Sequence, residues 1–449
     1  ESSAASDVYK RQAMMRVSGL LNQSLYAVAL TVCMFMLCGC NDLGTKECPR
    51  CQTFKSGMSR NLSGQKPIVN VYLENSGSMF GYVNGLTEFE ESVYSYLSDI
   101  CLSGIDSLNL YYINNRIIPQ QSNLGHSARI KDFIEKLSPN HFVSAGGSLG
   151  VTDIAEMMTS ILDKTDDETV SIFISDCIFS PGSGVNASEY LVNQQIGIKV
   201  AFADKLKDYN DLCVKAYRLN GKFKGRYYNR LNQPTNINEI RPFYLLLIGS
   251  EEMVNVITRK VPEDKIKGRG VEHSFTISNM PHKVNYEIVG IPKIGTFKKC
   301  MKNPKYHIVD AEKASKGKNK GNFMFSLGVD FSDFPIENDY LLEPENYELN
   351  SKDYALSVST FKGKGKHSHL LGFTLNSKMP KPGKCDLKVA LKKRLPSWII
   401  QCTDEEGLDI HEGDAMTQTY GLRYLFEGIY EAFTKDDNNN FAELKVFIN

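Results

Sequence analysis

Three short polar segments of this 449-residue chain carry side chains that could bind a ligand. They are Glu74–Ser78, Gly146–Asp153 and Asp176. Each contains hydroxyl or carboxylate oxygens, which are the groups that hard cations such as Mg²⁺ take as ligands. Each also lies at the end of an apolar run or just before a helical pattern. The chemistry they indicate is binding of a cation or a hydrogen-bonding ligand.

The apolar pattern predicts the elements that would position these segments. Alternation of strands and helices indicates an α/β fold with a doubly wound, mostly parallel sheet. Ligands on such sheets bind at the carboxyl ends of the strands, where the polar segments fall. The expected strands are 67–73, 108–113, 169–175, 213–219 and 243–248, and the expected helices are 87–100, 128–137, 152–162, 189–207 and 251–259.

With these elements in order, residues 66–260 resemble a von Willebrand factor type A (vWA) domain. That family binds a divalent cation through Asp-x-Ser-x-Ser after the first strand, a Thr on a second loop and an Asp after a central apolar strand. The resemblance implies a variant of the family's metal ion-dependent adhesion site (MIDAS), holding Mg²⁺ or Mn²⁺ and accepting a carboxylate from a protein partner. The matching residues are Glu74, Ser76, Ser78, Thr152 and Asp176.

Glu74 departs from the family pattern, in which an Asp occupies this position. Its side chain is one methylene longer, so the ion is either retained with a shifted geometry or lost, leaving a metal-free scaffold. In the second segment, Ser148 is an alternative ligand to Thr152, and Asp153 could add charge. Without a metal, the serines would cap the next helix, Thr152 or Asp153 would be an N-cap, and Asp176 a polar loop residue.

The first 65 residues are predicted to be a leader and a tether. Residues 1–13 are a polar upstream extension, and 14–39 have the short positive start and the uncharged apolar run of a signal peptide. The sequence Leu37-Cys38-Gly39-Cys40 resembles a bacterial lipobox. The resemblance implies lipid on Cys40 and anchoring to a membrane of the bacterial cell envelope, periplasmic or surface-exposed. An ordinary signal peptide or a buried apolar helix is the alternative.

Residues 40–65 are rich in Gly, Ser, Thr, Lys and Asn, which is typical of a flexible tether. Cys48 and Cys51 form a CxxC pair, but no second pair follows at zinc-finger spacing. A local disulfide or two free thiols is therefore favoured over zinc. The later cysteines are isolated, and we expect them to be small buried hydrophobes.

Residues 270–449 are predicted to be a β-rich, sandwich-like domain with one long helix. The helix has an apolar stripe over 419–433, which we expect to pack in a core rather than bind a partner. The motif His367-Ser368-His369 has no third ligand nearby in sequence, so a metal site is not expected there. The expected strands are 271–277, 284–289, 323–329, 354–360, 369–374, 385–390, 398–402 and 441–448.

Composition narrows the classes of partner. Lys+Arg and Asp+Glu both number 52, and the basic run Lys313–Lys320 has no interleaved aromatics, so nucleic acid is not expected as a partner. No familiar catalytic motif is present, so we expect no enzymatic activity, and a metal-dependent hydrolase is the least favoured function. The sequence favours an envelope lipoprotein whose vWA-like domain binds a protein partner. The alternative is an assembly or chaperone-like factor that uses a metal-free scaffold.

Overall fold

The computed structural model describes residues 66–121, 127–150, 153–182, 184–363, 365–435 and 439–449. The expected signal peptide, the lipobox with Cys40 and the tether lie outside these residues, as does Thr152. Residues 64–449 form one compact unit. In the part of the chain that the structure describes, no helix is long and apolar enough to cross a membrane.

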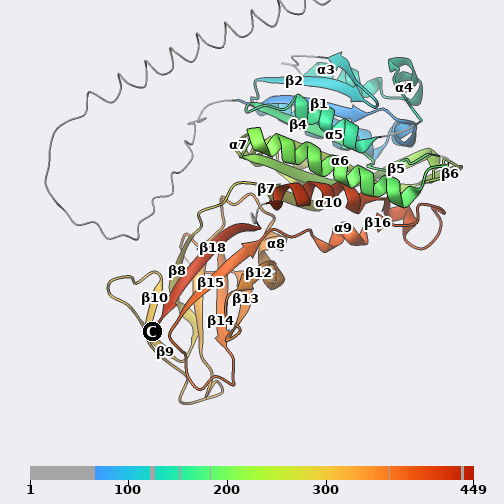
Figure 1. Ribbon diagram of the computed structural model, residues 1–449. Coiled ribbons are helices and arrows are strands. Elements are labelled where there is room, and N and C mark those ends of the chain that lie inside the picture. The colour runs from blue at the N-terminus through green and yellow to red at the C-terminus, as the bar shows by residue number, and fades with distance from the viewer. Residues whose placement is uncertain (1–65, 122–126, 151–152, 183, 364, 436–438) are drawn as a thin grey trace, which may run out of the picture. The chain divides into compact units, whose positions relative to one another are not determined.

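A seven-stranded sheet organises the first part of the described chain, in the order β3-β2-β1-β4-β6-β5-β7 (Figure 1). The central strands β2, β1 and β4 are parallel, and the flanking strands join in antiparallel pairs. The predicted α/β class is confirmed. The strands are β1 Ile68–Glu74, β2 Ser107–Ile113, β3 Ile117–Gln121, β4 Thr169–Ser175, β5 Leu212–Tyr228, β6 Pro234–Ser250 and β7 Val271–Ser278.

The hairpin of β5 and β6 is longer than the sequence predicted. Each strand has 17 residues, and they pair from Leu212 with Ser250 to Tyr228 with Pro234. The sequence predicted only the inner halves, because the outer halves are rich in polar residues and carry no continuous apolar run. Since Ser175 pairs with Tyr244, the outer half of the hairpin extends beyond the carboxyl end of β4.

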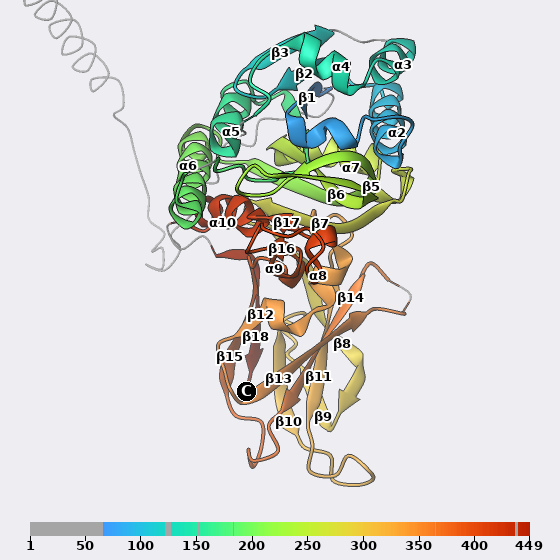
Figure 2. The ribbon, with the colours of Figure 1, turned by 90° about the vertical axis from the view of Figure 1, so that its right-hand side faces the viewer.

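Helices cover both faces of this sheet (Figure 2). On one side lie α2 (Glu88–Leu102) and α3 (Ser127–Glu135), and on the other lie α5 (Ile154–Asp163) and α6 (Ala187–Asp208). Helix α4 (Pro139–Ala145) ends directly before the second polar segment, and helix α7 (Glu251–Lys260) follows β6. Side-chain oxygens accept N–H groups at several helix starts, which explains where these helices begin. The capping residues are Thr87, Ser138, Asp153, Asn186 and Ser250.

Two segments beyond the predicted boundary near residue 270 belong with the α/β part. β7 pairs with β5, and α10 (Leu422–Phe433) packs against α6. The apolar stripe of α10 is therefore buried, as expected, but outside the β-rich domain. Residues 398–402 were wrongly predicted as a strand, because α9 (Ser397–Gln401) is helical. The apolar run in this segment is too short for its periodicity to distinguish a helix from a strand.

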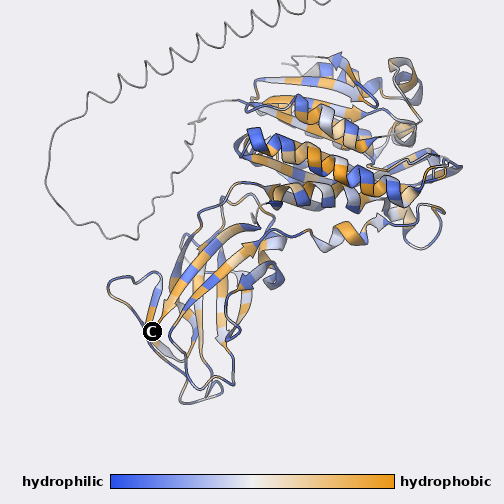
Figure 3. Ribbon diagram, in the orientation of Figure 1, coloured by the Kyte–Doolittle hydropathy of each residue, from blue (hydrophilic) through white to orange (hydrophobic). Residues whose placement is uncertain are grey.

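The β-rich part is a sandwich of two sheets, β12-β15-β18-β10-β9 and β13-β14-β11-β8. One apolar core takes side chains from both sheets, including Phe325, Phe373 and Leu444. Hydrophobic and hydrophilic bands alternate along β15 and β18 (Figure 3), as expected for strands with one face in a core. The strands are β8 Asn285–Ile294, β9 Thr296–Lys299, β10 His307–Glu312, β11 Met324–Asp330, β12 Tyr347–Leu349, β13 Tyr354–Thr360, β14 His369–Leu375, β15 Cys385–Lys392 and β18 Asn440–Ile448.

Candidate functional site

The first and third polar segments lie side by side at the carboxyl ends of β1 and β4. These strands are parallel neighbours, and Leu73 pairs with Ile174 near their ends. The next residue of β1 is Glu74, and its carboxylate accepts a hydrogen bond from the hydroxyl of Ser175. Both residues are buried. Glu74 is thus tied to the neighbouring strand and lies behind the polar segment rather than projecting from it.

The two serines of the first segment face each other. Ser76 Oγ and Ser78 Oγ are 2.9 Å apart. A short 3-10 helix, η1 (Gly77–Gly81), follows Ser76, but the side chain of Ser76 makes no capping hydrogen bond to it. The capping role considered for the serines is therefore not present at Ser76. Two neutral oxygens instead lie next to each other at the edge of the sheet.

Asp176 is fully buried, and one of its two oxygens lacks a partner. Oδ1 accepts the backbone N–H of Ile178 at 3.2 Å, whereas Oδ2 makes no hydrogen bond with any described residue. Burial raises the pKa of this carboxyl to about 6, although the Ile178 N–H, Ser78 and Arg241 each lower it. A buried carboxylate oxygen without a donor is unfavourable. A cation beside Oδ2 would remove that cost.

A pair of asparagines joins the second segment to the first. Asn114 follows β2, and its Nδ2 donates to Asn75 Oδ1 and to the carbonyl of Gly146, both at 3.0 Å. The backbone N–H of Gly77 also donates to the carbonyl of Leu149 at 2.9 Å. These bonds bring residues 146–149 against the first segment. The sequence analysis did not identify Asn114, because nothing in a single sequence indicates a bond between residues 39 positions apart.

Two glycines make this approach possible. Gly146 and Gly147 both have φ of +85°, a conformation that favours glycine. A Cβ at position 147 would lie 2.2 Å from Oδ1 of Asn114. The Gly146-Gly147 pair is therefore required both for the backbone conformation and for the space that Asn114 occupies.

The candidate ligands of the second segment differ in their structural roles. Asp153 caps α5, since its Oδ1 accepts the N–H of Glu156 at 2.9 Å. Ser148 is partly exposed, and its backbone N–H donates to Oδ1 of Asn115 at 2.8 Å. Thr152 lies outside the described residues, so its role as a ligand stays a prediction.

A buried arginine that the sequence analysis did not identify lies near Asp176. Arg241, on β6, is 1% exposed, and its Nη1 donates to the carbonyls of Ala415 and Met416, both at 3.0 Å. Its positive charge lowers the pKa of Asp176. The signal available in the sequence was an arginine two positions before the apolar run 243–248, which lies in the buried half of β6.

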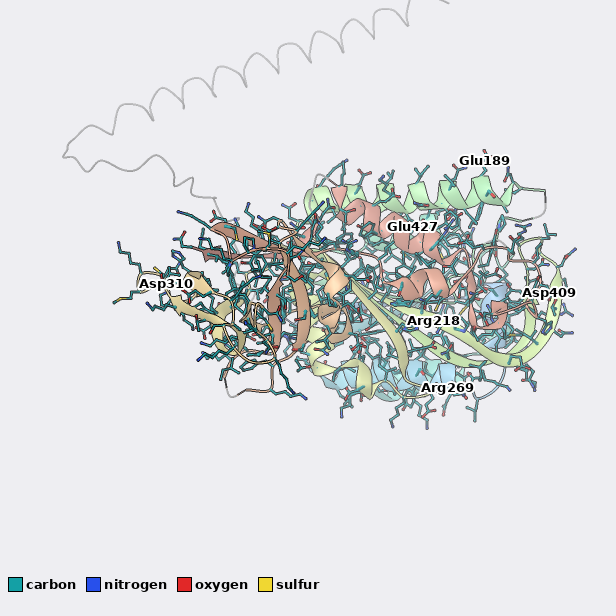
Figure 4. The ribbon with its side chains drawn as sticks, turned by 90° about the horizontal axis from the view of Figure 1, so that it is seen from below. Glu189, Arg218, Arg269, Asp310, Asp409 and Glu427 are labelled. Atoms are coloured by element: carbon teal, nitrogen blue, oxygen red, sulfur yellow. The ribbon has the colours of Figure 1, made fainter. Side chains whose placement is uncertain are left out.

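The chain between α9 and α10 borders this edge of the sheet. It contains the short paired strands β16 (Thr403–Asp404) and β17 (Thr419–Tyr420). The N–H of Phe179 donates to the carbonyl of Tyr420 at 3.4 Å, and the backbone N–H of Arg230, at the hairpin end, donates to the carbonyl of Gly407 at 2.8 Å. Arg218, labelled in Figure 4, is 2% exposed and donates to the carbonyl of Thr417. Residues from late in the chain thus contribute to the surroundings of the candidate site.

The donor set fits a hard, oxygen-preferring cation such as Mg²⁺ or Mn²⁺ better than it fits zinc. Among the residues that the structure describes, no three His, Cys, Asp or Glu side chains converge in a way that could hold a metal. An ion here would rely on Ser76, Ser78 and Asp176, with water completing its shell. Mg²⁺ and Mn²⁺ accept such oxygen ligands, whereas zinc sites in proteins are built from Cys and His with some carboxylates.

Comparison with known proteins adds little to this geometry. No family model matches the chain, and no curated protein matches it. A solved structure described as von Willebrand factor type A from Catenulispora acidiphila aligns at 11% identity, with a TM-score of 0.18. The alignment covers 42% of this chain and 58% of that one.

Proposed function

We propose that the α/β part binds a protein partner through the edge formed by Glu74–Ser78, Gly146–Leu149 and Asp176, with Mg²⁺ or Mn²⁺ at its centre. The observation that carries the proposal is the buried Oδ2 of Asp176, which has no partner among the described residues. In this proposal Ser76, Ser78 and Asp176 hold the ion. Thr152 or Ser148 supplies a further hydroxyl.

The chain's own residues would leave the ion open to a partner. When bound, the ion would supply an electrophilic centre that accepts a carboxylate oxygen. Ser76 and Ser78 contribute no charge, and the carboxylate of Glu74 is already bonded to Ser175. Asp176 would then be the only charged ligand among the three, so the bound ion would keep a net positive charge that attracts an acidic side chain of a partner. The asparagine pair would keep the second segment in place.

A second candidate function uses the same edge without a metal. It is an assembly or chaperone-like factor for an envelope complex, and the observation that favours it is Arg241. A guanidinium near a buried carboxylate can compensate its charge in place of an ion. The bond from Ser175 to Glu74 also satisfies the residue that departs from the family pattern.

The proposed function includes a cellular location for the protein. We propose that lipid on Cys40 anchors the protein to a bacterial envelope membrane and that residues 40–65 tether the folded part to it. This rests on the lipobox-like sequence alone. The proposal contains no catalytic step, and a metal-dependent hydrolase stays the least favoured alternative.

Calorimetric titration of Mn²⁺ into the full chain tests the proposed site. We expect binding in the wild type and at least tenfold weaker binding in Asp176→Asn, which keeps the side-chain shape but loses the charge. The matched control is Asp163→Asn, an exposed Asp at the end of α5. Equal Mn²⁺ affinity in all three proteins would overturn the assignment of the site.

Thermal melts in EDTA and, separately, in excess Mn²⁺ distinguish the two candidate functions. If the edge is metal-free, the wild type binds no Mn²⁺, and Arg241→Gln lowers the melting temperature by leaving Asp176 uncompensated. If the metal site is real, Mn²⁺ raises the melting temperature of the wild type but not of Asp176→Asn, because a ligand of the native state stabilises it.

A further inference from the structure

We propose that the sandwich carries a second binding site, for a neutral oligosaccharide, in a pocket beside β8 and β11. The pocket has a volume of about 550 Å³. This lies within the range of ~300–1,000 Å³ that is typical of small-molecule sites. It belongs to the β-rich part and shares no residue with the edge that contains Asp176, so the inference is independent of the proposed function.

Three aromatic rings line the pocket, from Tyr286, Tyr306 and Phe361. The centroids of the two tyrosine rings are 4.7 Å apart, with the rings tilted by 50°. Tyr286 is held in place because its hydroxyl accepts the N–H of Lys445 at 2.8 Å and donates to the carbonyl of Lys445 at 3.0 Å. Fixed, partly exposed aromatic faces among polar groups suit the C–H faces of sugar rings.

The charged side chains of the pocket balance each other. Glu287 and Asp330 are acidic, whereas Lys305 and Lys366 are basic. Nε2 of His367 lies 3.1 Å from Oε1 of Glu287, so one acid is already paired. Equal numbers of both signs give no net attraction for an anion or a cation. Hydroxyl groups both donate and accept, so a neutral polyol can bond with both kinds of side chain.

A glycine in β11 leaves room for the side chain that forms one wall of this pocket. The ring of His367 lies over Gly328 of β11, and a Cβ at Gly328 would be 2.6 Å from Cδ2 of His367. The same ring meets Phe361 edge-to-face, with centroids 5.6 Å apart. Hydrogen bonding and packing thus fix His367 before any ligand arrives, which reduces the entropy lost on binding. The histidine motif that we excluded as a metal site contributes to this wall instead.

Saturation-transfer NMR of the full chain tests the inference, with cellotriose, maltotriose, chitotriose and mannotriose as probes. EDTA is present, so that the result does not depend on the metal site. We expect transfer to at least one trisaccharide and about tenfold weaker binding in Tyr306→Ala, since one stacking face is lost. The control is Tyr94→Ala, a tyrosine of α2 that is 36% exposed and outside this pocket.

Transfer to none of the four probes, or equal binding by Tyr306→Ala and the wild type, would overturn the inference. The thermal midpoint of each variant shows whether it is folded. If Tyr306→Ala does not fold, Glu287→Gln takes its place, because it is nearly isosteric and its side chain is 40% exposed. We then expect weaker binding by Glu287→Gln, and unchanged affinity would contradict the site.

Discussion

The α/β part and the sandwich bury different kinds of side chain. Around the carboxyl edge of the sheet, buried groups include Glu74, Asn75, Asn114, Asp176 and Arg241. In the sandwich the core is apolar, and among the residues that the structure describes its buried polar side chains are few, namely Ser326, His369 and Lys393.

Burying a polar group is unfavourable unless it finds partners. The buried polar groups at this edge suit the binding role that we propose for it, whereas the apolar core of the sandwich serves stability. Most polar groups of the sandwich lie outside its core, and some of them line the pocket. Each prediction below tests this division between a polar edge and an apolar core.

The largest effect is expected in the sandwich core. Phe325 is fully buried and stacks on Phe373, with centroids 4.9 Å apart. Phe325→Ala should lower the free energy of unfolding by ~3–5 kcal/mol, because a large cavity replaces the ring. Urea denaturation measures this. The folded protein should still bind Mn²⁺ as tightly as the wild type, and loss of binding would show that the two regions are not independent.

A smaller loss of stability, with a loss of binding, is expected at the polar edge. Gly147→Ala places a Cβ against Asn114 at a positive φ, which should cost ~1–3 kcal/mol. It should also weaken Mn²⁺ binding by displacing the second segment. Gly150→Ala is the matched control, since a Cβ there meets nothing within 4 Å. If both variants bind Mn²⁺ alike, the second segment does not contribute to the site.

Replacing one buried polar group of the sandwich with an apolar one should stabilise the protein. Lys393 is 1% exposed, its Nζ has no hydrogen-bond partner among the described residues, and burial lowers its pKa to about 8. A lowered folded-state pKa means that stability is lost as the pH falls from about 10.5 through 8.

Lys393→Met should therefore raise the free energy of unfolding at pH 7 by ~2 kcal/mol, and the gain should shrink toward pH 10. Chemical denaturation at the two pH values measures it. The neighbour Lys392→Met should change stability little, because Lys392 is partly exposed in an ion pair with Glu348. A destabilised Lys393→Met would mean that the ammonium group has a partner that compensates it.

The smallest predicted effect is a change in how the stability of the protein depends on pH. Glu90 takes part in the cap of α2, where its N–H donates to Thr87 Oγ1, and burial raises the pKa of its carboxyl to about 7. A raised pKa means that the stabilising, protonated form is lost as the pH rises from about 4.5 through 7. Glu90→Gln should remove ~1 kcal/mol of this decline. Melting temperatures from pH 5 to 8 test this against the exposed neighbour Glu91→Gln, which should decline as the wild type does.

The sequence predicted the central elements well because their apolar runs are long and buried. The strand expected at 169–175 has the same bounds as β4, and the helices expected at 189–207 and 251–259 are α6 and α7 to within two residues. It did not predict the outer half of the β5–β6 hairpin, since partly exposed residues there carry no continuous apolar signal.

The residues of the candidate site were predictable only where they follow a predicted strand. Glu74, Ser76, Ser78 and Asp176 could be placed because each follows a strand that was itself predicted. Arg241 and Asn114 could not, because their importance comes from contacts made after folding with residues far along the chain. Whether Thr152 completes the set stays a prediction, since it lies outside the described residues.

The most direct test of the metal site is anomalous X-ray scattering from crystals of the full chain grown with Mn²⁺. We predict one strong manganese peak bordered by Ser76, Ser78 and Asp176, and its absence from crystals of Asp176→Asn. No peak at this edge in the wild type, with Arg241 bonded to Asp176 in its place, would contradict the metal site and favour the metal-free scaffold.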